Sequence, residues 1–169
     1  STFYTEKKLD FENDEICANE CVILRDQINP SHSAVGRFDL RGGAIVPLIK
    51  ATDGVWGLHP KNVEQSFALD LLLNDDVQLV SLVGKAGTGK TLLAIAAGLQ
   101  KTLDEGRYKR LLVSRPIFPM GKDVGYLPGD IDQKLNPWMQ PVFDNVELLM
   151  GGADSRRRGG LSGLSLIHI

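Results

Sequence analysis

One eight-residue segment restricts the possible folds of this chain more than any other part of the sequence. Gly84-Lys-Ala-Gly-Thr-Gly-Lys-Thr91 matches the pattern G-x-x-x-x-G-K-[ST] at every fixed position. Glycines let such a loop turn successive backbone N–H groups inward around a phosphate, and the helix that follows directs its positive end at the same anion. The pattern is meaningful only where a strand precedes the loop and a helix follows it.

The flanking sequence meets both requirements. Val77–Val83 has few polar positions, as expected for a strand that is buried on both faces of a parallel sheet. Thr91–Glu105 begins with turns that are apolar nearly all round, which is typical of a buried helix, and Gly106 is expected to end it. Leu111–Ser114 is the next predicted strand. The order strand, helix, strand predicts a right-handed βαβ unit.

The residues of the loop have separate expected roles in binding a nucleoside triphosphate. Lys90 is predicted to be the catalytic residue that reaches the β- and γ-phosphates as a point charge, and the Thr91 hydroxyl is predicted to ligate Mg²⁺. The other nucleotide-binding residues are expected to contribute their backbone, and they are Gly84, Lys85, Ala86, Gly87, Thr88 and Gly89.

A second element that hydrolysis requires is missing from the sequence. In this class an Asp or Glu at the end of another strand holds Mg²⁺ and positions the attacking water. Leu111–Ser114 leads into Arg115 instead, Val146–Met150 has a helical pattern, and Asp154 lies among glycines. We therefore expect this chain to be a truncated part of a larger ATPase that binds nucleotide weakly and does not hydrolyse it.

The first 54 residues predict a small antiparallel β-rich segment. Strands are expected at Cys21–Arg25, 34–40 and 44–49, with a tight turn at Arg41-Gly42-Gly43 between the last two. A helix is predicted after Asn62, whose side chain would form a loose capping box with Gln65.

A further helix is predicted near the end of the chain. Asn136 precedes Pro137 as an N-cap, and the helix is expected to cover Pro137–Met150 with a kink at Pro141. Gly151-Gly152 would end it.

Composition limits the class of protein and the charge suggests a partner. The 169 residues are 43% hydrophobic and 24% charged, which excludes membrane, collagen-like and wholly disordered classes. The only cysteines, Cys17 and Cys21, lack a second Cys/His pair for zinc, so reduced thiols and a cytoplasmic location are expected. Residues 1–83 carry 7 cationic and 13 acidic residues, whereas residues 84–169 carry 12 and 8. A polyanionic partner would meet the second half.

Several blocks in addition to the loop occur in a recognisable order. They are Trp56–Gln65, Leu82–Ala94, Val113–Pro116, Gly125–Gly129 and Pro137–Asn145. On these blocks, from about Val55 to Gly151, the sequence resembles the PhoH-like ATPase family, and most closely its tandem PIN–PhoH type.

The resemblance implies a helicase-like P-loop ATPase core with a RecA-like parallel sheet, using ATP and Mg²⁺. It also implies single-stranded RNA as a partner, and ring-like homo-oligomers of the full-length protein. Gln65 matches the glutamine that reads adenine in related helicase folds, where an amide can donate and accept at once. The alternative for Gln65 is that it only caps its helix.

The expected organisation is an α/β fold with a partial P-loop NTPase. Residues 1–54 would be a β-rich lead-in without the carboxylate cluster of a PIN nuclease, and residues 55–152 an incomplete ATPase domain. Residues 153–169 are expected to be a disordered tail, whose ending, Leu164–Ile169, looks like translated sequencing-adapter read-through.

Two matters stay open at this level. The segment 115–140 interleaves cations with aromatic residues, as in surfaces that hold single strands, but the aromatic residues could equally cover the core. The loop could also serve a small-molecule kinase, or an ATP-binding switch that does not hydrolyse its nucleotide. In segment 115–140 the cations are Arg115, Lys122 and Lys134, and the interleaved aromatic residues are Phe118, Tyr126 and Trp138.

Overall fold

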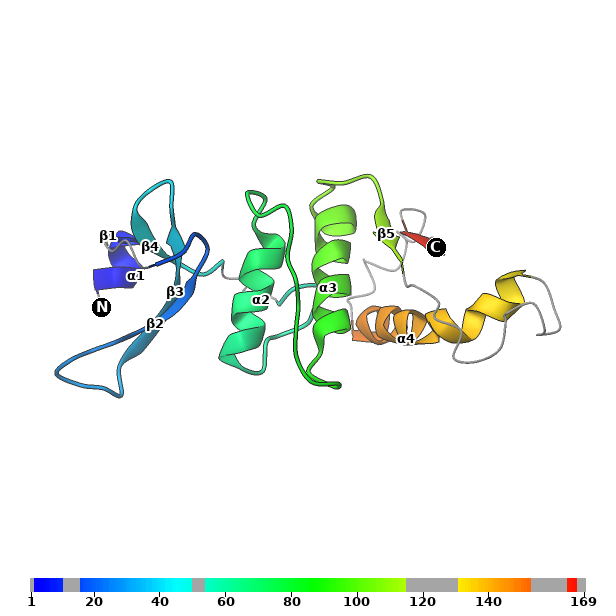
Figure 1. Ribbon diagram of the computed structural model, residues 1–169, viewed down its shortest axis with the longest axis horizontal. Helices are drawn as coiled ribbons and strands as arrows, with labels where there is room; N and C mark the ends of the chain where they lie inside the picture. The colour runs from blue at the N-terminus through cyan, green and yellow to red at the C-terminus, as the bar shows by residue number, and fades with distance from the viewer. Residues whose placement is uncertain (1, 11–15, 50–53, 115–130, 153–163, 167–169) are drawn as a thin grey trace. The chain divides into compact units, whose positions relative to one another are not determined.

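A computed structural model describes residues 2–10, 16–49, 54–114, 131–152 and 164–166 of the chain. The elements form a mixed α/β structure (Figure 1). They fall into two compact units, of which the first comprises Ser1–Thr52 and Pro60–Val80, and the second Asp53–His59 and Ser81–Ile169.

The first unit is built on a four-stranded antiparallel sheet in the order β1-β4-β3-β2. The predicted antiparallel strands are confirmed, and Gly43 has the positive φ, +57°, that its turn requires. The last strand ends at Pro47, two residues earlier than predicted, because proline has no N–H to donate to a strand partner. The strands are β1 Leu9–Asp10, β2 Cys21–Arg25, β3 Ser33–Asp39 and β4 Ala44–Pro47, preceded by helix α1 Thr2–Glu6.

Helix α2, Val63–Leu73, confirms the predicted helix and its cap. The Asn62 side chain accepts a hydrogen bond from the Gln65 N–H at 2.8 Å. Gln65 Oε1 in turn accepts from the Lys61 N–H at 2.7 Å. The first bond satisfies a backbone donor that the first turn of a helix leaves without an intrahelical partner, and the second ties the helix to Lys61, the residue before its N-cap.

A buried carboxylate joins α2 to the sheet within the first unit. Asp70 is 1% exposed, and its Oδ2 accepts from Arg37 Nε on β3 at 2.8 Å. Its Oδ1 accepts from the Ile49 N–H at 2.7 Å. Arg37 also donates to the Asn19 side chain at 3.0 Å, so the guanidinium is held from two sides. The buried charge is therefore both paired and hydrogen-bonded, as burial of a carboxylate requires.

The same buried pair affects a neighbouring thiol. Both cysteines are free, Cys17 is exposed, and Cys21 is half-buried on β2. Burial is the main cause that raises the pKa of the Cys21 thiol, and the carboxylates of Asp70 and Glu20 raise it further against the opposing effect of Arg37. A thiol with a raised pKa carries less of the nucleophilic thiolate at neutral pH, so Cys21 has the character of a structural residue.

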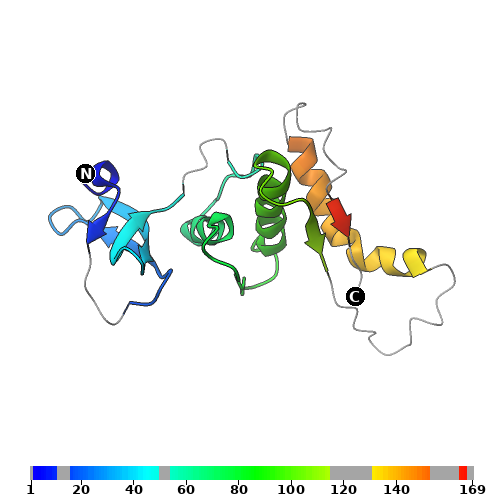
Figure 2. The same ribbon diagram turned by 90° about the horizontal axis from the view of Figure 1, so that it is seen from above.

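The second unit is centred on α3, Lys90–Leu99, which continues into a π-helical turn, η1, Gln100–Asp104 (Figure 2). The predicted burial of α3 is confirmed, and it contacts helix α4, Ile131–Gly152. A Cβ on Gly98 would lie 2.6 Å from Leu111 Cδ1, so glycine allows strand β5, Leu111–Val113, to approach the helix closely. The buried apolar residues of the two helices include Leu93, Ile95, Ala96, Ala97, Leu99, Met139, Val142 and Leu149.

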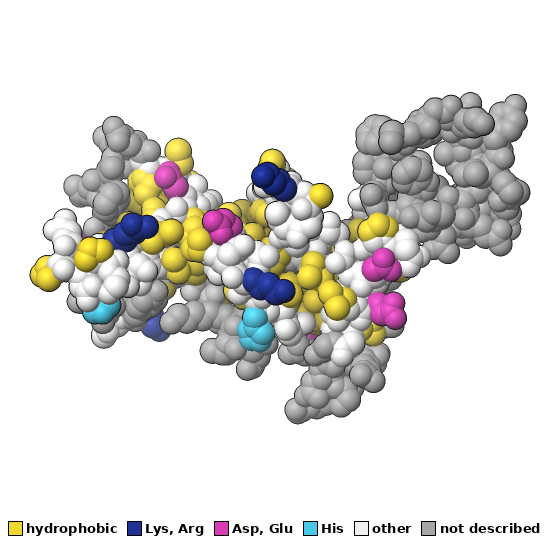
Figure 3. All heavy atoms as spheres, turned by 90° about the horizontal axis from the view of Figure 1, so that it is seen from below, with side chains coloured by type: hydrophobic (Ala, Val, Ile, Leu, Met, Phe, Trp, Pro, Cys, Tyr) yellow, Lys and Arg dark blue, Asp and Glu magenta, His cyan; other side chains and the backbone are white. Residues whose placement is uncertain are grey.

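The predicted strand before the glycine loop is wrong for this structure. Val77–Val83 pairs with none of the described segments, and Leu79 and Val83 are 87% and 93% exposed. The predicted βαβ unit is consequently not formed. A strand exists only where neighbours complete its hydrogen-bond ladder, and β5 pairs in parallel with β6, Leu164–Leu166, instead. Apolar side chains are visible on the surface in Figure 3, and the large ones with the greatest exposure are Ile28, Leu40, Leu79, Val83 and Leu148.

Two predictions near the C-terminus also need correction. Helix α4 begins at Ile131, six residues before the predicted start, so Pro137 and Pro141 both lie inside it. A proline inside a helix lacks an N–H donor and its ring crowds the carbonyl four residues earlier, so the helix passes it with a bend, which both ribbon views show (Figures 1 and 2). Strand β6 lies in the segment expected to be disordered, where the alternation Leu-Ser-Leu has the period of a strand.

Candidate nucleotide-binding site

The glycine loop has the backbone conformation that its sequence requires. It leads directly into the N-terminus of α3 (Figure 1). Gly87 has a φ of +79° and Gly89, the N-cap of α3, a φ of +86°. Residues with a Cβ rarely adopt these values, so both glycines are needed for the path of the chain. A Cβ on Gly87 would have nothing within 4 Å, which shows that its conformation, rather than crowding, requires glycine.

The first turn of α3 presents backbone donors without a side-chain cap. Gly89 forms no side-chain capping bond, and its carbonyl accepts the first helical bond from the Leu93 N–H at 2.9 Å. Free N–H groups and the positive end of the helix dipole together attract an anion. The donor set therefore fits a phosphate group.

Lys90 directs its ammonium group back onto the loop. Its Nζ donates to the carbonyl oxygens of Gly84 at 3.0 Å and Lys85 at 2.7 Å, and to Thr88 Oγ1 at 3.3 Å. The Thr88 hydroxyl donates its own proton to the Lys85 carbonyl at 3.0 Å. Three N–H donors of the ammonium thus meet three acceptors of the loop. The structure thus brings together four of the predicted site residues, Gly84, Lys85, Thr88 and Lys90, through the contacts of the Lys90 ammonium at the start of α3.

Thr91, the predicted Mg²⁺ ligand, lies in the first turn of α3 and is exposed. Within the described ranges no group of three or more His, Cys, Asp or Glu side chains could hold a metal ion. The metal role of Thr91 therefore stays a prediction.

The remaining predicted residues have less defined surroundings. Ala86 lies in the exposed turn of the loop. Gln65 belongs to the first unit, where its amide takes part in the capping of α2, so its role at adenine stays a prediction. The predicted RNA contacts lie outside the described residues or have side chains that are not described, and they are Arg115, Lys122, Lys134, Phe118, Tyr126 and Trp138.

The sequence interpretation missed a tryptophan hairpin at the far end of α3. Val55 and Leu58 exchange two backbone hydrogen bonds of 2.9 Å, and the turn residues Trp56 and Gly57 have φ of +52° and +78°, as in a type I′ turn. Positive φ is unusual for a large residue and is maintained only where the surroundings hold it. The dipeptide Trp-Gly between two apolar residues is a weak hairpin signal that could have indicated this turn.

Two hydrogen bonds and burial of the side chain hold Trp56 in this conformation. The side chain is 2% exposed, and its Nε1 donates to Asp104 Oδ1 at 3.2 Å. Its backbone N–H donates to Gln100 Oε1, also at 3.2 Å. Both acceptors belong to η1. The hairpin is therefore fastened to the helix that begins at the glycine loop.

The indole bond gives a stability prediction. Trp56→Phe should lower the free energy of unfolding by roughly 1–3 kcal/mol, because it removes one hydrogen bond and part of a buried ring. Urea unfolding followed by far-ultraviolet circular dichroism measures the change. Asp104→Asn retains an acceptor oxygen and should cost less. Equal stability of Trp56→Phe and the unsubstituted chain would contradict the importance of this contact.

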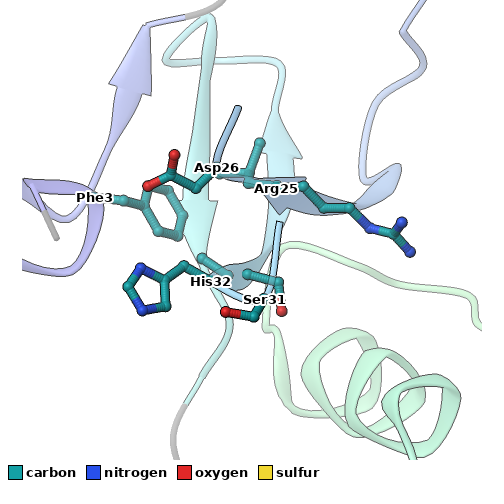
Figure 4. A pocket seen from close by; sticks show the side chains of 8 residues that line it. Phe3, Arg25, Asp26, Ser31 and His32 are labelled. Carbon is teal, nitrogen blue, oxygen red and sulfur yellow. The ribbon is translucent and has the colours of Figure 1, made fainter. Parts of the chain in front are cut away.

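A separate cavity of about 590 Å³ lies in the first unit. Figure 4 shows the Phe3 ring and the His32 imidazole close to one another, whereas the Arg25 side chain points away from them. The Asp26 carboxylate at its edge accepts from the Ile28 N–H at 2.8 Å, so it stabilises the turn between β2 and β3.

Comparison with known families decides the relationship of this chain. The family model described as PhoH-like protein matches residues 57–159, which include the whole glycine loop. The chain belongs to the PhoH-like protein family. Membership suggests a P-loop ATPase, in agreement with the resemblance inferred from the sequence blocks. No solved structure matches the chain.

Three curated relatives are called Protein PhoH2. The relative from Bacillus subtilis (strain 168) is 50% identical over 152 residues, which is 88% of this chain and 34% of the relative. The relative from Mycolicibacterium smegmatis is 44% identical over 128 residues, 73% of this chain and 29% of the relative. The relative from Thermobispora bispora is 35% identical over 152 residues, 83% of this chain and 35% of the relative. The chain thus spans about a third of the length of these PhoH-like relatives.

None of the helices in the described part of this PhoH-like chain is both long and apolar enough to span a bilayer.

Proposed function

We propose that this chain carries the ATP-binding part of a PhoH-like P-loop ATPase, and that the full-length protein couples ATP hydrolysis to RNA unwinding or degradation. One observation carries the proposal. The glycine loop, in which Gly87 and Gly89 have positive φ, leads into the uncapped N-terminus of α3, and the Lys90 ammonium donates to the carbonyls of this loop. Membership of the PhoH-like family supports the same conclusion.

Binding of the triphosphate would exchange contacts that the loop already makes. The backbone amides of Gly87–Thr91 would donate hydrogen bonds to the phosphate oxygens. The Lys90 ammonium would give up its hydrogen bonds to the Gly84 and Lys85 carbonyls and donate to the β- and γ-phosphates instead. Gln65 is the proposed reader of adenine. Thr91 is the proposed holder of Mg²⁺, which would neutralise phosphate charge when bound.

The core of the full-length protein is proposed to be a RecA-like parallel sheet. In that sheet, Val77–Val83 would pair with neighbouring strands, and its apolar composition favours such a buried position. In this structure the segment has no such neighbours among the described residues, and Val83 is 93% exposed. The carboxylate for hydrolysis would come from a part of the protein outside these 169 residues. The chain alone is accordingly proposed to bind nucleotide without turnover.

Coupling to RNA is tested by the ATPase rate of the full-length protein. Single-stranded RNA should raise the steady rate of phosphate release, because an RNA motor couples ATP hydrolysis to movement along the RNA that it binds. Phosphate release is measured with and without RNA at saturating ATP. A rate that no RNA changes would overturn the coupling, and a phosphorylated small molecule in place of free phosphate would indicate a kinase.

A further inference from the structure

We infer that the exposed segment Arg107-Tyr108-Lys109-Arg110, here called the basic loop, binds single-stranded nucleic acid. It joins η1 to β5, at the end of α3 opposite the glycine loop (Figure 1). The choice of RNA over DNA rests on the proposed function. The surface itself rests on the geometry and charge of the loop.

The backbone of the basic loop is fixed while its side chains face solvent. The N–H groups of Arg107 and Tyr108 both donate to the Lys101 carbonyl, at 2.8 and 3.3 Å, and Gly106 turns the chain with a φ of +60°. All four side chains are exposed, and Tyr108 is 54% exposed. The loop is thus presented in a defined conformation, which reduces the entropy that binding would cost.

The acidic residues beside the basic loop are engaged by other groups. Asp104 accepts the indole N–H of Trp56, and Glu105 pairs with Lys101 at 3.3 Å. Lys109 and Arg110 have no ion-pair partner in the described part of the chain. Because the indole is neutral, Asp104 keeps its negative charge, but residues 101–110 still hold four cationic against two acidic side chains. The charges of Lys109 and Arg110 are therefore available to a polyanion.

The combination of residue types favours a single strand over other anions. Cations that contact phosphates, together with an aromatic ring on which an unpaired base can stack, form the usual surface for single strands. A double helix keeps its bases stacked internally and would leave the Tyr108 ring without that partner. An acidic peptide would use the cations and gain little from the ring.

The distance from the glycine loop makes this site separable from the nucleotide site. Fifteen helical residues, Lys90–Asp104, lie between them, which corresponds to about 20 Å at 1.5 Å per residue. Substitutions in the basic loop should therefore leave ATP contacts intact. In a motor, such a position would hold RNA independently of the nucleotide state.

The test is fluorescence anisotropy with a labelled 20-nucleotide polyuridine RNA, between 50 and 300 mM KCl, on the complete 169-residue chain. The double variant Lys109→Gln/Arg110→Gln should reduce the slope of log affinity against log salt by about 1.4, at about 0.7 per phosphate contact. The variant Tyr108→Ala should weaken binding by between about fivefold and a hundredfold with little change of slope. Tyr108→Phe should retain the affinity.

The control variant Lys7→Gln/Lys8→Gln removes the same charge elsewhere and should bind RNA normally. Polydeoxyuridine, duplex RNA and polyglutamate serve as competitors that separate RNA from other anions. Equal affinity and slope for the double variant and the unsubstituted chain, or stronger competition by polyglutamate than by polyuridine, would overturn the inference. Lys90→Ala should bind RNA normally, so a failure of ATP binding is distinguishable from a failure of this surface.

Discussion

Lys90→Ala should weaken binding of ATP to the chain by roughly 10- to 150-fold. Hydrogen bonds to charged groups contribute about 1.5–3 kcal/mol, and Lys90 is the cation that the loop holds beside its open amides. The same change should abolish phosphate release by the full-length protein. Titration of a fluorescent ATP analogue measures the first effect, and a phosphate-release assay the second.

Lys85→Ala is the matched control for that experiment. Lys85 lies in the same loop and carries the same charge, but the contact that it makes with Lys90 uses its backbone carbonyl, which alanine retains. ATP affinity should fall much less than in Lys90→Ala. If the two variants lose equal affinity, general charge rather than the position of Lys90 governs binding. Unchanged affinity in Lys90→Ala would overturn the proposed site.

Asp70→Ala should destabilise the first unit by about 3–5 kcal/mol. The change leaves the Arg37 guanidinium, whose side chain is 11% exposed, without its carboxylate, and it leaves the Ile49 N–H without an acceptor. Removing one partner of a buried ion pair is costly because the other charge stays buried and unpaired. Chemical unfolding followed by circular dichroism measures the loss.

The exposed pair Arg41–Asp76 provides the comparison for the buried one. Its N–O distance is 3.0 Å, but the side chains are 79% and 65% exposed, so Asp76→Ala should cost less than about 1 kcal/mol. A double variant, Arg37→Met/Asp70→Leu, should recover part of the stability that Asp70→Ala loses. A loss in Asp70→Ala no larger than in Asp76→Ala would contradict the role assigned to the buried carboxylate.

The elements that sequence reasoning predicted well depend on local chemistry. The Asn62 cap of α2, the turn at Gly43 and the conformation of Gly87 and Gly89 follow from side chains and φ values within a few residues. The strand at Val77–Val83 failed because its existence depends on partners that local sequence cannot supply. The start of α4 failed because proline was taken as a boundary where the helix tolerates it.

Contacts between distant segments could not be predicted from the sequence. Arg37 and Asp70 are 33 residues apart, and Trp56 and Asp104 are 48 apart. In sequence each is an ordinary polar or aromatic residue, and only the folded structure shows the pairing. The predicted phosphate site was accessible to sequence reasoning because all its members lie within Gly84–Thr91.

The contacts of Lys90 have a calorimetric consequence. An ammonium that already donates to two carbonyls and a hydroxyl cannot gain three new bonds when phosphate arrives. It can only replace existing bonds with stronger, charge-assisted ones. The heat released on nucleotide binding should therefore reflect the difference between two sets of contacts, and it should be smaller than a count of bonds in the bound state would suggest.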